Sequence, residues 1–232
     1  MKNKRSLSYR IYSKNSLKMA EDKTNLLGIN NKLNAVSLLN MRLIVTFIIF
    51  ILLLYFVDFG YFVAPLVAFL AYQLFFPFVI DTKIEKRRKK LEKDALYFFE
   101  ILLLSLEAGR NIKTAIEVTT ININSDLSDE FKKVIKDVNY GKDLDEALEE
   151  LKYRIPSDTI NSIILNIRQS NMFGNNIIDT VYSQIAYIRE KRILETKALI
   201  SKIPIKISVI SVIFFIPLLL LLLLGPLILE LF

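Results

Sequence analysis

Three long apolar stretches divide the chain, and polar sequence lies between and around them. The first, residues 43–57, reads LIVTFIIFILLLYFV and contains no charged residue. With Met41 and Arg42 at its edge it makes about 17 residues, or ~26 Å of helix, enough to cross the hydrocarbon of a bilayer. The second stretch is 61–80 and the third is 203–232. The pattern predicts three transmembrane helices, and the alternative for the first two is a buried hairpin of a soluble protein.

Helix-breaking residues within these stretches predict where each one turns or bends. The sequence DFG at positions 58–60 separates the first two stretches, so we expect a tight membrane hairpin over residues 41–80. Pro77 falls near the end of this hairpin, where a neighbouring helix can satisfy the backbone groups that proline frees. In the C-terminal stretch, Pro217 predicts a kink, and Gly225-Pro226 predicts an end or a bend near the far face.

The polar segment 81–202 has the period of amphipathic helices. The stretch 94–108, DALYFFEILLLSLEA, is apolar on all sides and is predicted to be a central buried helix. A re-entrant membrane segment is the alternative, which its shortness and Glu100 disfavour. Five further helices are expected at 111–122, 125–140, 143–155, 157–173 and 176 to about 202, each with an apolar stripe. The predicted fold class is all-α, with three transmembrane helices and a cytoplasmic six-helix antiparallel bundle made of helical hairpins.

A short unit repeats at three corners of this predicted bundle. A glycine follows a helical stripe, where it can adopt positive φ without steric cost, and a side chain that favours helix N-caps follows two residues later. The three pairs are Gly109 and Asn111, Gly141 and Asp143, and Gly174 and Asn176. None of these glycines follows a predicted strand, and no glycine-rich phosphate-binding motif is present, so nucleotide binding is disfavoured.

The amino-acid composition argues against most enzyme mechanisms. The chain is 53% hydrophobic with a mean hydropathy of +0.37, and it contains no cysteine and no histidine. Disulfides, thiolate or imidazole metal sites and histidine-activated nucleophiles are therefore excluded. An intramembrane aspartyl protease would need two carboxylates together in the bilayer, but Asp58 and Glu230 both lie near the outer ends. The adjacent Glu149 and Glu150 are expected on a solvated helix face. We expect no enzyme, no cofactor and no metal.

The distribution of charge predicts the orientation in the membrane. Residues 1–42 contain nine Lys or Arg against two acidic residues, whereas residues 81–202 contain 21 basic and 20 acidic side chains. The run KIEKRRKK, at 83–90, directly follows the second stretch. By the positive-inside rule, the tail 1–40 and the domain 81–202 are cytoplasmic and the C-terminus is outside. We favour the run as a topology determinant over a site for anionic lipid or an acidic partner.

The tail 1–40 is polar and basic and is expected to be disordered or loosely helical. Because the positive charge flanks apolar stretches, nucleic acid is not an expected partner.

Several motifs occur in a fixed order along the chain. They are LEAGRNIKTAI, GKDLDEAL, LKYR, RQSNMFGNNI and REKRILETKA, followed by Lys202-x-Pro204, Pro217 and Gly225-Pro226. In this order the chain resembles the type II secretion system F family, and most closely its Tad pilus C-protein branch, over residues 40–230. It departs from the usual pattern at Ser170-Asn171, where members commonly have a small residue and an acid. It also has one copy of a helical unit that two-domain members carry twice.

The resemblance implies a non-enzymatic inner-membrane platform for pilus assembly or protein secretion. Its implied partners are a cytoplasmic secretion ATPase, pilin-like subunits, the lipid bilayer and a second platform subunit, either a homodimer partner or a sister protein. The positions carried over by motif are Glu107, Gly109, Gly141, Arg154, Gln169, Gly174, Arg189, Arg192 and Glu195. Arg189 and Arg192 are expected at a contact with a partner or another helix. The competing hypothesis is a membrane-anchored helical scaffold or sensor unrelated to pili, and an intramembrane enzyme ranks third.

Overall fold

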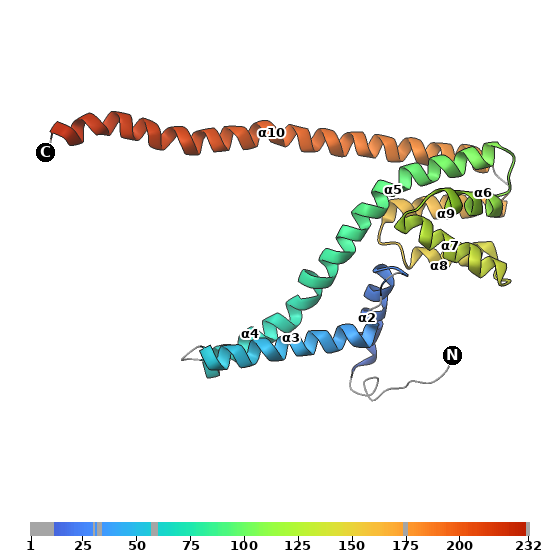
Figure 1. Ribbon diagram of the computed structural model, residues 1–232, viewed down its shortest axis with the longest axis horizontal. Helices are drawn as coiled ribbons and strands as arrows, with labels where there is room; N and C mark the ends of the chain where they lie inside the picture. Colours follow the sequence, from blue (N-terminus) through green and yellow to red (C-terminus); the bar gives the residue numbers. More distant parts are fainter. Residues whose placement is uncertain (1–11, 30, 32–33, 57–59, 174–175, 231–232) are drawn as a thin grey trace. The chain divides into compact units, whose positions relative to one another are not determined.

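The computed structural model describes residues 12–29, 31, 34–56, 60–173 and 176–230, and every regular element in these ranges is helical (Figure 1). The prediction of an all-α protein is therefore confirmed. The helices are α2 (Lys14–Leu26), α3 (Ala35–Phe56), α4 (Gly60–Phe75), the π-helix η1 (Phe76–Asp81), α5 (Thr82–Glu107), α6 (Ile112–Asn122), α7 (Asp126–Asn139), α8 (Leu144–Lys152), α9 (Asp158–Phe173) and α10 (Ile177–Glu230). Two units divide the chain, Met1–Ile185 and Ala186–Phe232.

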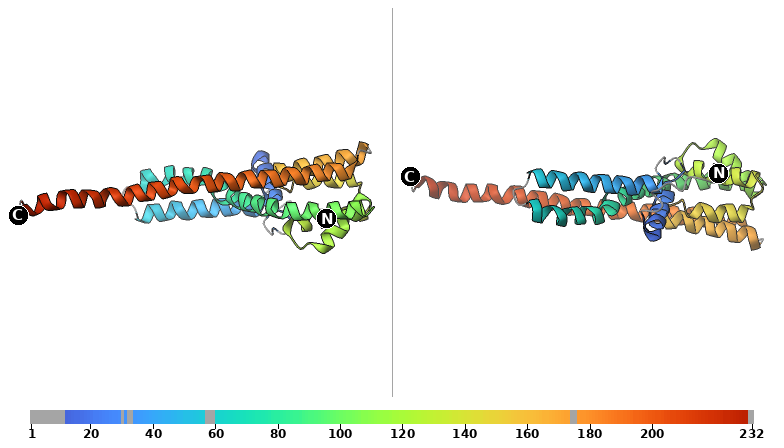
Figure 2. Two further views of the ribbon diagram at one scale, coloured as in Figure 1. Left: turned by 90° about the horizontal axis from the view of Figure 1, so that it is seen from above. Right: turned by 90° about the horizontal axis from the view of Figure 1, so that it is seen from below.

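Three helices are long and apolar enough to cross a membrane, as predicted. The first is α3, with 22 residues and a mean hydropathy of 2.4. It packs against α4 as a helical hairpin, which Figure 2 shows from two sides. The predicted turn at Asp58 lies outside the described residues. The third is α10, which crosses the unit boundary and carries the C-terminal apolar stretch.

The first membrane helix begins at Ala35, several residues before the predicted start at position 41. Its first turn is held by packing, since Leu38 and Leu39 are buried together with Phe76 and Ile80 of η1. The apolar contact therefore extends the helix beyond its uncharged stretch.

The second membrane helix continues into the polar segment without a loop. It passes from α4 through the π-helix η1 into α5, so the backbone is helical from Gly60 to Glu107. Pro77 lies in η1 and has no N–H to donate, which removes one bond from the helical ladder. In the same turn, Arg42 of α3 donates from Nε to the carbonyl oxygen of Tyr72 at 2.7 Å, and its guanidinium lies 3.4 Å from the Tyr72 ring centroid. The donor from α3 thus compensates locally for the irregular backbone.

The first helix of the polar segment was predicted to begin at residue 94, but α5 begins at Thr82. The basic run 83–90 consists mainly of good helix formers, and Arg88 pairs with Glu85 at 2.6 Å and with Glu92 at 3.0 Å. Pairs three and four residues apart stabilise a helix by a few tenths of a kcal/mol each. The charged run is therefore a helical extension of the second span.

The N-terminal tail contains a helix where we expected disorder or loose helicity. In α2, Leu17 and Ala20 are buried against the cluster that holds Leu38 and Phe76. Lys23 forms an ion pair with Asp81, the last residue of η1. Alone, a 13-residue helix of this polar composition would be marginal, so packing against the base of the hairpin stabilises it.

The helices that follow enclose an aromatic core. Phe98 and Phe99 of α5 are fully buried, and Phe131 of α7 stacks on Phe98 with ring centroids 4.6 Å apart. Consecutive helices from α5 to α9 pack against each other, and α5 also contacts α7 and α9. The start of α10 meets α9 through a hydrogen bond between the Thr180 and Ser170 hydroxyls at 2.7 Å. The segment 94–108 of α5 supplies buried core side chains, but it is not buried on all sides as predicted, because Tyr97 and Leu104 are 58% and 59% exposed.

The C-terminal stretch does not end where its sequence suggested. The helix α10 is continuous through Pro217 and through Gly225-Pro226 to Glu230. An unpaired backbone group in hydrocarbon costs several kcal/mol, so within an apolar segment the chain retains its remaining helical bonds around a proline. Of the end or bend predicted at Gly225-Pro226, the end is therefore wrong.

Candidate functional site

Two of the predicted corner glycines end helices in the same way. Gly109 has φ +80° and Gly141 has φ +98°, the left-handed conformation that glycine adopts without strain. After α5, Arg110 N donates to Ser105 O at 3.4 Å and Gly109 N donates to Leu106 O at 2.9 Å. After α7, Lys142 and Gly141 make the equivalent bonds to Asp137 and Val138, which is a Schellman motif in both cases. Gly174 lies outside the described residues.

The predicted capping residues bond to the first turns of the next helices. Asn111 Oδ1 accepts from Thr114 N at 2.8 Å, and Asp143 Oδ2 accepts from Asp145 N at 2.9 Å. Asn176 Oδ1 accepts from Ile178 N at 3.1 Å. The five of these positions that the structure describes therefore form helix ends.

The predicted contact residues fall into two groups. Most are on the surface: Glu107, Gln169, Arg189 and Glu195 are exposed, and Arg192 is half-buried. Glu107 is exposed at the last residue of α5. Arg154 differs from all of these because its side chain is 11% exposed.

Arg154 belongs to a buried cluster of three charges. Glu130 of α7, whose side chain is 1% exposed, accepts from Arg154 Nε at 2.9 Å and from Arg87 Nη2 of α5 at 2.7 Å. Arg87 Nη1 also donates to the carbonyl oxygen of Arg154 at 2.6 Å. Each carboxylate oxygen of Glu130 thus faces one guanidinium. We call Arg87, Glu130 and Arg154 the charge cluster.

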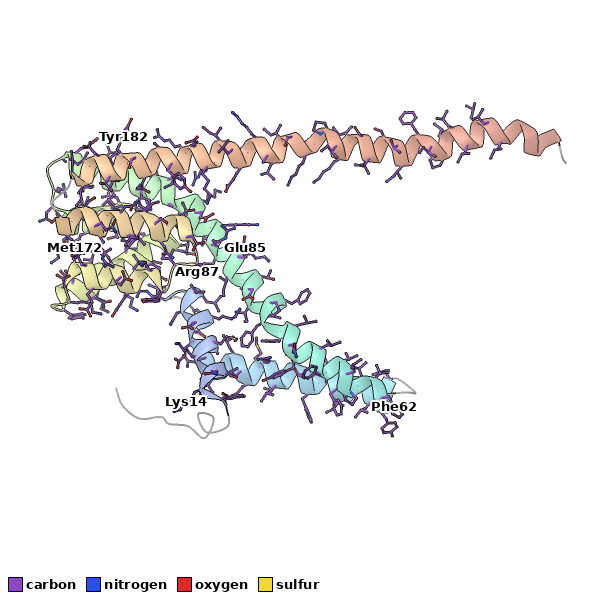
Figure 3. The ribbon with its side chains drawn as sticks, turned by 180° about the vertical axis from the view of Figure 1, so that it is seen from behind. Lys14, Phe62, Glu85, Arg87, Met172 and Tyr182 are labelled. Atoms are coloured by element: carbon purple, nitrogen blue, oxygen red, sulfur yellow. The ribbon has the colours of Figure 1, made fainter. Side chains whose placement is uncertain are left out.

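The charge cluster also holds the end of α2. Arg87 Nη1 donates to the carbonyl oxygen of Leu26 at 2.7 Å, and Glu130 Oε1 accepts from Ile29 N at 3.0 Å. Gly28 lies between these contacts with φ +88°, and a Cβ atom there would lie 2.4 Å from Arg87 Nη2. Figure 3 shows Arg87 on α5 where the end of α2 approaches it. The cluster therefore joins α2, α5, α7 and the segment after α8.

Burial and the neighbouring carboxylate shift the pKa of Arg87 in opposite directions. Desolvation lowers the pKa of the Arg87 guanidinium from its ordinary value, and the Glu130 carboxylate opposes that shift. The group stays protonated because an arginine side chain does not lose its proton in proteins. One carboxylate between two guanidiniums leaves a net positive charge beside α5.

A second polar contact joins α5 to the segment between α8 and α9. Ser157 Oγ donates to Glu92 Oε1 at 2.7 Å, and Arg88 donates to the same carboxylate. Beside it, α2, α5 and residues 152–161 line an open cavity of about 960 Å³. The cavity is lined by both acidic and basic side chains, including Asp22, Lys23, Glu85 and Lys152. Its electrostatic potential is therefore not dominated by one sign of charge.

None of these arrangements has the parts of a catalytic site. Among the described residues, no group of three or more potential ligands could hold a metal ion. Within the charge cluster, the one carboxylate is engaged by two guanidiniums, which leaves it no capacity as a general base. The geometry of the charge cluster is that of a structural contact that holds helices together.

Sequence reasoning did not identify Arg87 or Glu130. A signal for Glu130 was present, because it lies three residues after Leu127 and four before Val134 on the buried stripe of α7. A carboxylate at an inward position of an amphipathic helix predicts a buried cationic partner. Arg87 lies in the run 83–90, where seven of the eight residues are charged, so the sequence pattern does not distinguish it from its neighbours.

A comparison of the sequence with known protein families identifies the family of this chain. Residues 98–225, more than half of the chain, match the family described as type II secretion system (T2SS), protein F. The chain belongs to the type II secretion system F family. No curated protein and no solved structure matches it.

The F-family match runs from α5 into α10 and so is narrower than the resemblance over residues 40–230. It includes Glu130 and Arg154 but leaves out α2, the membrane hairpin and Arg87. Members of the F family are structural platform proteins of type II secretion and type IV pilus-related systems. Family membership and three apolar helices together indicate an inner-membrane protein.

Proposed function

We propose that this chain is the inner-membrane platform of a Tad-like pilus or type II secretion machine, coupling a cytoplasmic secretion ATPase to insertion or extraction of pilin subunits. The observation that carries the proposal is the family match, which spans both the amphipathic helices α6–α9 and the apolar part of α10. In this role the chain performs no chemistry of its own. The order of motifs favours the Tad C-protein branch.

Helix continuity supports a mechanical role. The helical backbone is uninterrupted from Gly60 to Glu107, and α10 is one helix of 54 residues. Each of these helices links an apolar stretch to the polar segment without an intervening loop. A displacement applied to the polar segment would thus be transmitted along helices, which bend much less readily than loops.

We propose that the tail 1–40 and the domain 81–202, including its six helices, are cytoplasmic and that the C-terminus is outside. Thiol labelling tests this orientation, and because the chain contains no cysteine, a single introduced thiol is the only one that can be labelled. Tyr140 is 80% exposed between α7 and α8, so Tyr140→Cys should react with an impermeant maleimide only after the membrane is opened. Labelling in intact cells would reverse the proposed orientation.

We propose that Gln169, Arg189, Arg192 and Glu195, together with Glu107, contribute to contacts with the ATPase or with a second platform subunit. All five are at least partly accessible. Exposed Ile193 and Ile200 lie seven residues apart on α10, after Arg189 and Arg192 in the sequence, and offer apolar area for a second helix. A homodimer or a sister subunit would supply the second helical unit that two-domain relatives carry in one chain.

Co-purification tests this function. The full-length chain should retain a secretion ATPase of the same organism when both are extracted from membranes. Arg189→Glu with Arg192→Glu should weaken retention, whereas charge reversal of exposed Lys132 and half-buried Asp129 on α7 should not. Retention unaffected by any surface reversal would argue against the assigned contacts, and absence of retention would favour an unrelated membrane scaffold.

A further inference from the structure

A small basic cavity lies beside α5, apart from the proposed ATPase contacts. Its volume is about 410 Å³. One wall consists of Lys83, Lys86, Arg87 and Lys90, which share a face of α5 at spacings of three and four residues. The opposite wall includes apolar Leu27 and Ile29. The cavity therefore combines cations with apolar side chains.

The charges around the cavity do not cancel. Lys90 pairs with Asp126 at 2.9 Å, which neutralises one of the cations. Arg87 shares Glu130 with Arg154, so that group keeps one net positive charge. Lys83 and Lys86 are exposed, and neither forms an ion pair with a described carboxylate within 4.0 Å. The site thus has a surplus of about three positive charges.

The cavity lies at the depth of lipid headgroups. The apolar part of the helix ends at Ile80, and Lys83 and Lys86 follow by three and six residues. At about 1.5 Å of rise per residue they lie about 4.5 Å and 9 Å beyond it along the helix. The headgroup layer of each leaflet is about 5–8 Å thick, so both ammonium groups can reach phosphates at the membrane surface.

We propose that this cavity binds the phosphate headgroup of an anionic phospholipid. Lys83 and Lys86 hold the phosphate, the net charge of the Arg87 group adds to the field, and Leu27 and Ile29 contact the first part of the lipid chains. Basic pockets at the cytoplasmic ends of membrane helices suit anionic lipid headgroups. Because Leu27 and Ile29 follow α2, the bound lipid would also fix the N-terminal segment against α5.

Native mass spectrometry of the full-length protein tests the proposal. Apparent affinities are measured for phosphatidylglycerol, phosphatidylcholine and soluble glycerol phosphate. The test variant is Lys83→Gln with Lys86→Gln, and the control is Lys89→Gln with Lys93→Gln, which removes the same charge from α5 outside the cavity. Circular dichroism checks that both variants keep the helical content of the wild type.

The wild type should prefer phosphatidylglycerol, and raised salt should weaken the preference. The test variant should bind it about 25-fold more weakly, because each of the two lysines contributes about fivefold near an anionic surface. The control should change the affinity less than about threefold. Equal weakening in both variants would show that only overall charge matters and would overturn the site. Glycerol phosphate bound as tightly as the lipid would overturn the lipid assignment.

Discussion

Removing the negative charge of Glu130 should destabilise the protein more than any change to a surface charge. Glu130→Gln keeps the shape of the side chain but leaves Arg87 and Arg154, whose side chains are 12% and 11% exposed, without a counter-charge. The bond from Ile29 N can persist to the amide oxygen, so the main loss is electrostatic. Breaking a buried ion pair by removing one partner costs about 3–5 kcal/mol, because the remaining charge stays buried.

Thermal unfolding of the full-length protein, followed by circular dichroism, measures this cost. A loss of about 3 kcal/mol corresponds to a melting temperature lowered by about 6–12 °C for a protein of this size. The matched control is Glu150→Gln, whose side chain is 46% exposed and pairs with Lys142 at 2.6 Å. An exposed pair contributes about 0–1 kcal/mol, so the control should shift the transition by only about 0–4 °C.

The same variant should loosen α2. Arg87 donates to Leu26 O and Glu130 accepts from Ile29 N, so a weakened charge cluster exposes this segment to exchange. Hydrogen exchange of residues 20–29 should rise in Glu130→Gln and stay unchanged in Glu150→Gln. A melting temperature within 2 °C of the wild type, with unchanged exchange at these residues, would refute the role assigned to the cluster.

Three further changes test the local geometry. Gly28→Ala should lower the free energy of unfolding more than Gly109→Ala. Both glycines have positive φ, so alanine costs about 1–2 kcal/mol of strain at each, but of the two only Gly28 faces a side chain, Arg87, within 4 Å. Equal losses of stability in denaturant titrations would contradict this. Asn111→Ala should cost about 1 kcal/mol through loss of the cap of α6, and a loss below 0.3 kcal/mol would remove that role. Arg42→Met should raise hydrogen exchange around Pro77, because it removes the donor to Tyr72 O; unchanged exchange there would show that the turn does not need this donor.

Sequence was informative wherever a feature depends on residues close together in the chain. The stripe of Leu127, Phe131 and Val134 predicts α7, and the spacing of Gly109 and Asn111 predicts a Schellman turn followed by a capped helix. Both are local consequences of helical period and backbone sterics.

Features that depend on distant partners were missed. The helix α2 is polar and short, and it is held by Leu38, Phe76 and Asp81, which lie 12 or more residues away. The charge cluster joins residues 24 to 67 positions apart, and none of its members is unusual in its own segment. The helix end that was one of the two outcomes predicted at Gly225-Pro226 is also absent, because in an apolar segment backbone pairing outweighs the tendency of both residues to end a helix.

Binding of a secretion ATPase to the intact protein tests the central claim most directly. The full-length chain is reconstituted in nanodiscs, and binding of a purified secretion ATPase from the same organism is followed by interferometry, with empty nanodiscs as the control. The account predicts saturable binding that Arg189→Glu with Arg192→Glu weakens at least tenfold, with the melting temperature unchanged. Binding no stronger than to empty nanodiscs would contradict the platform function.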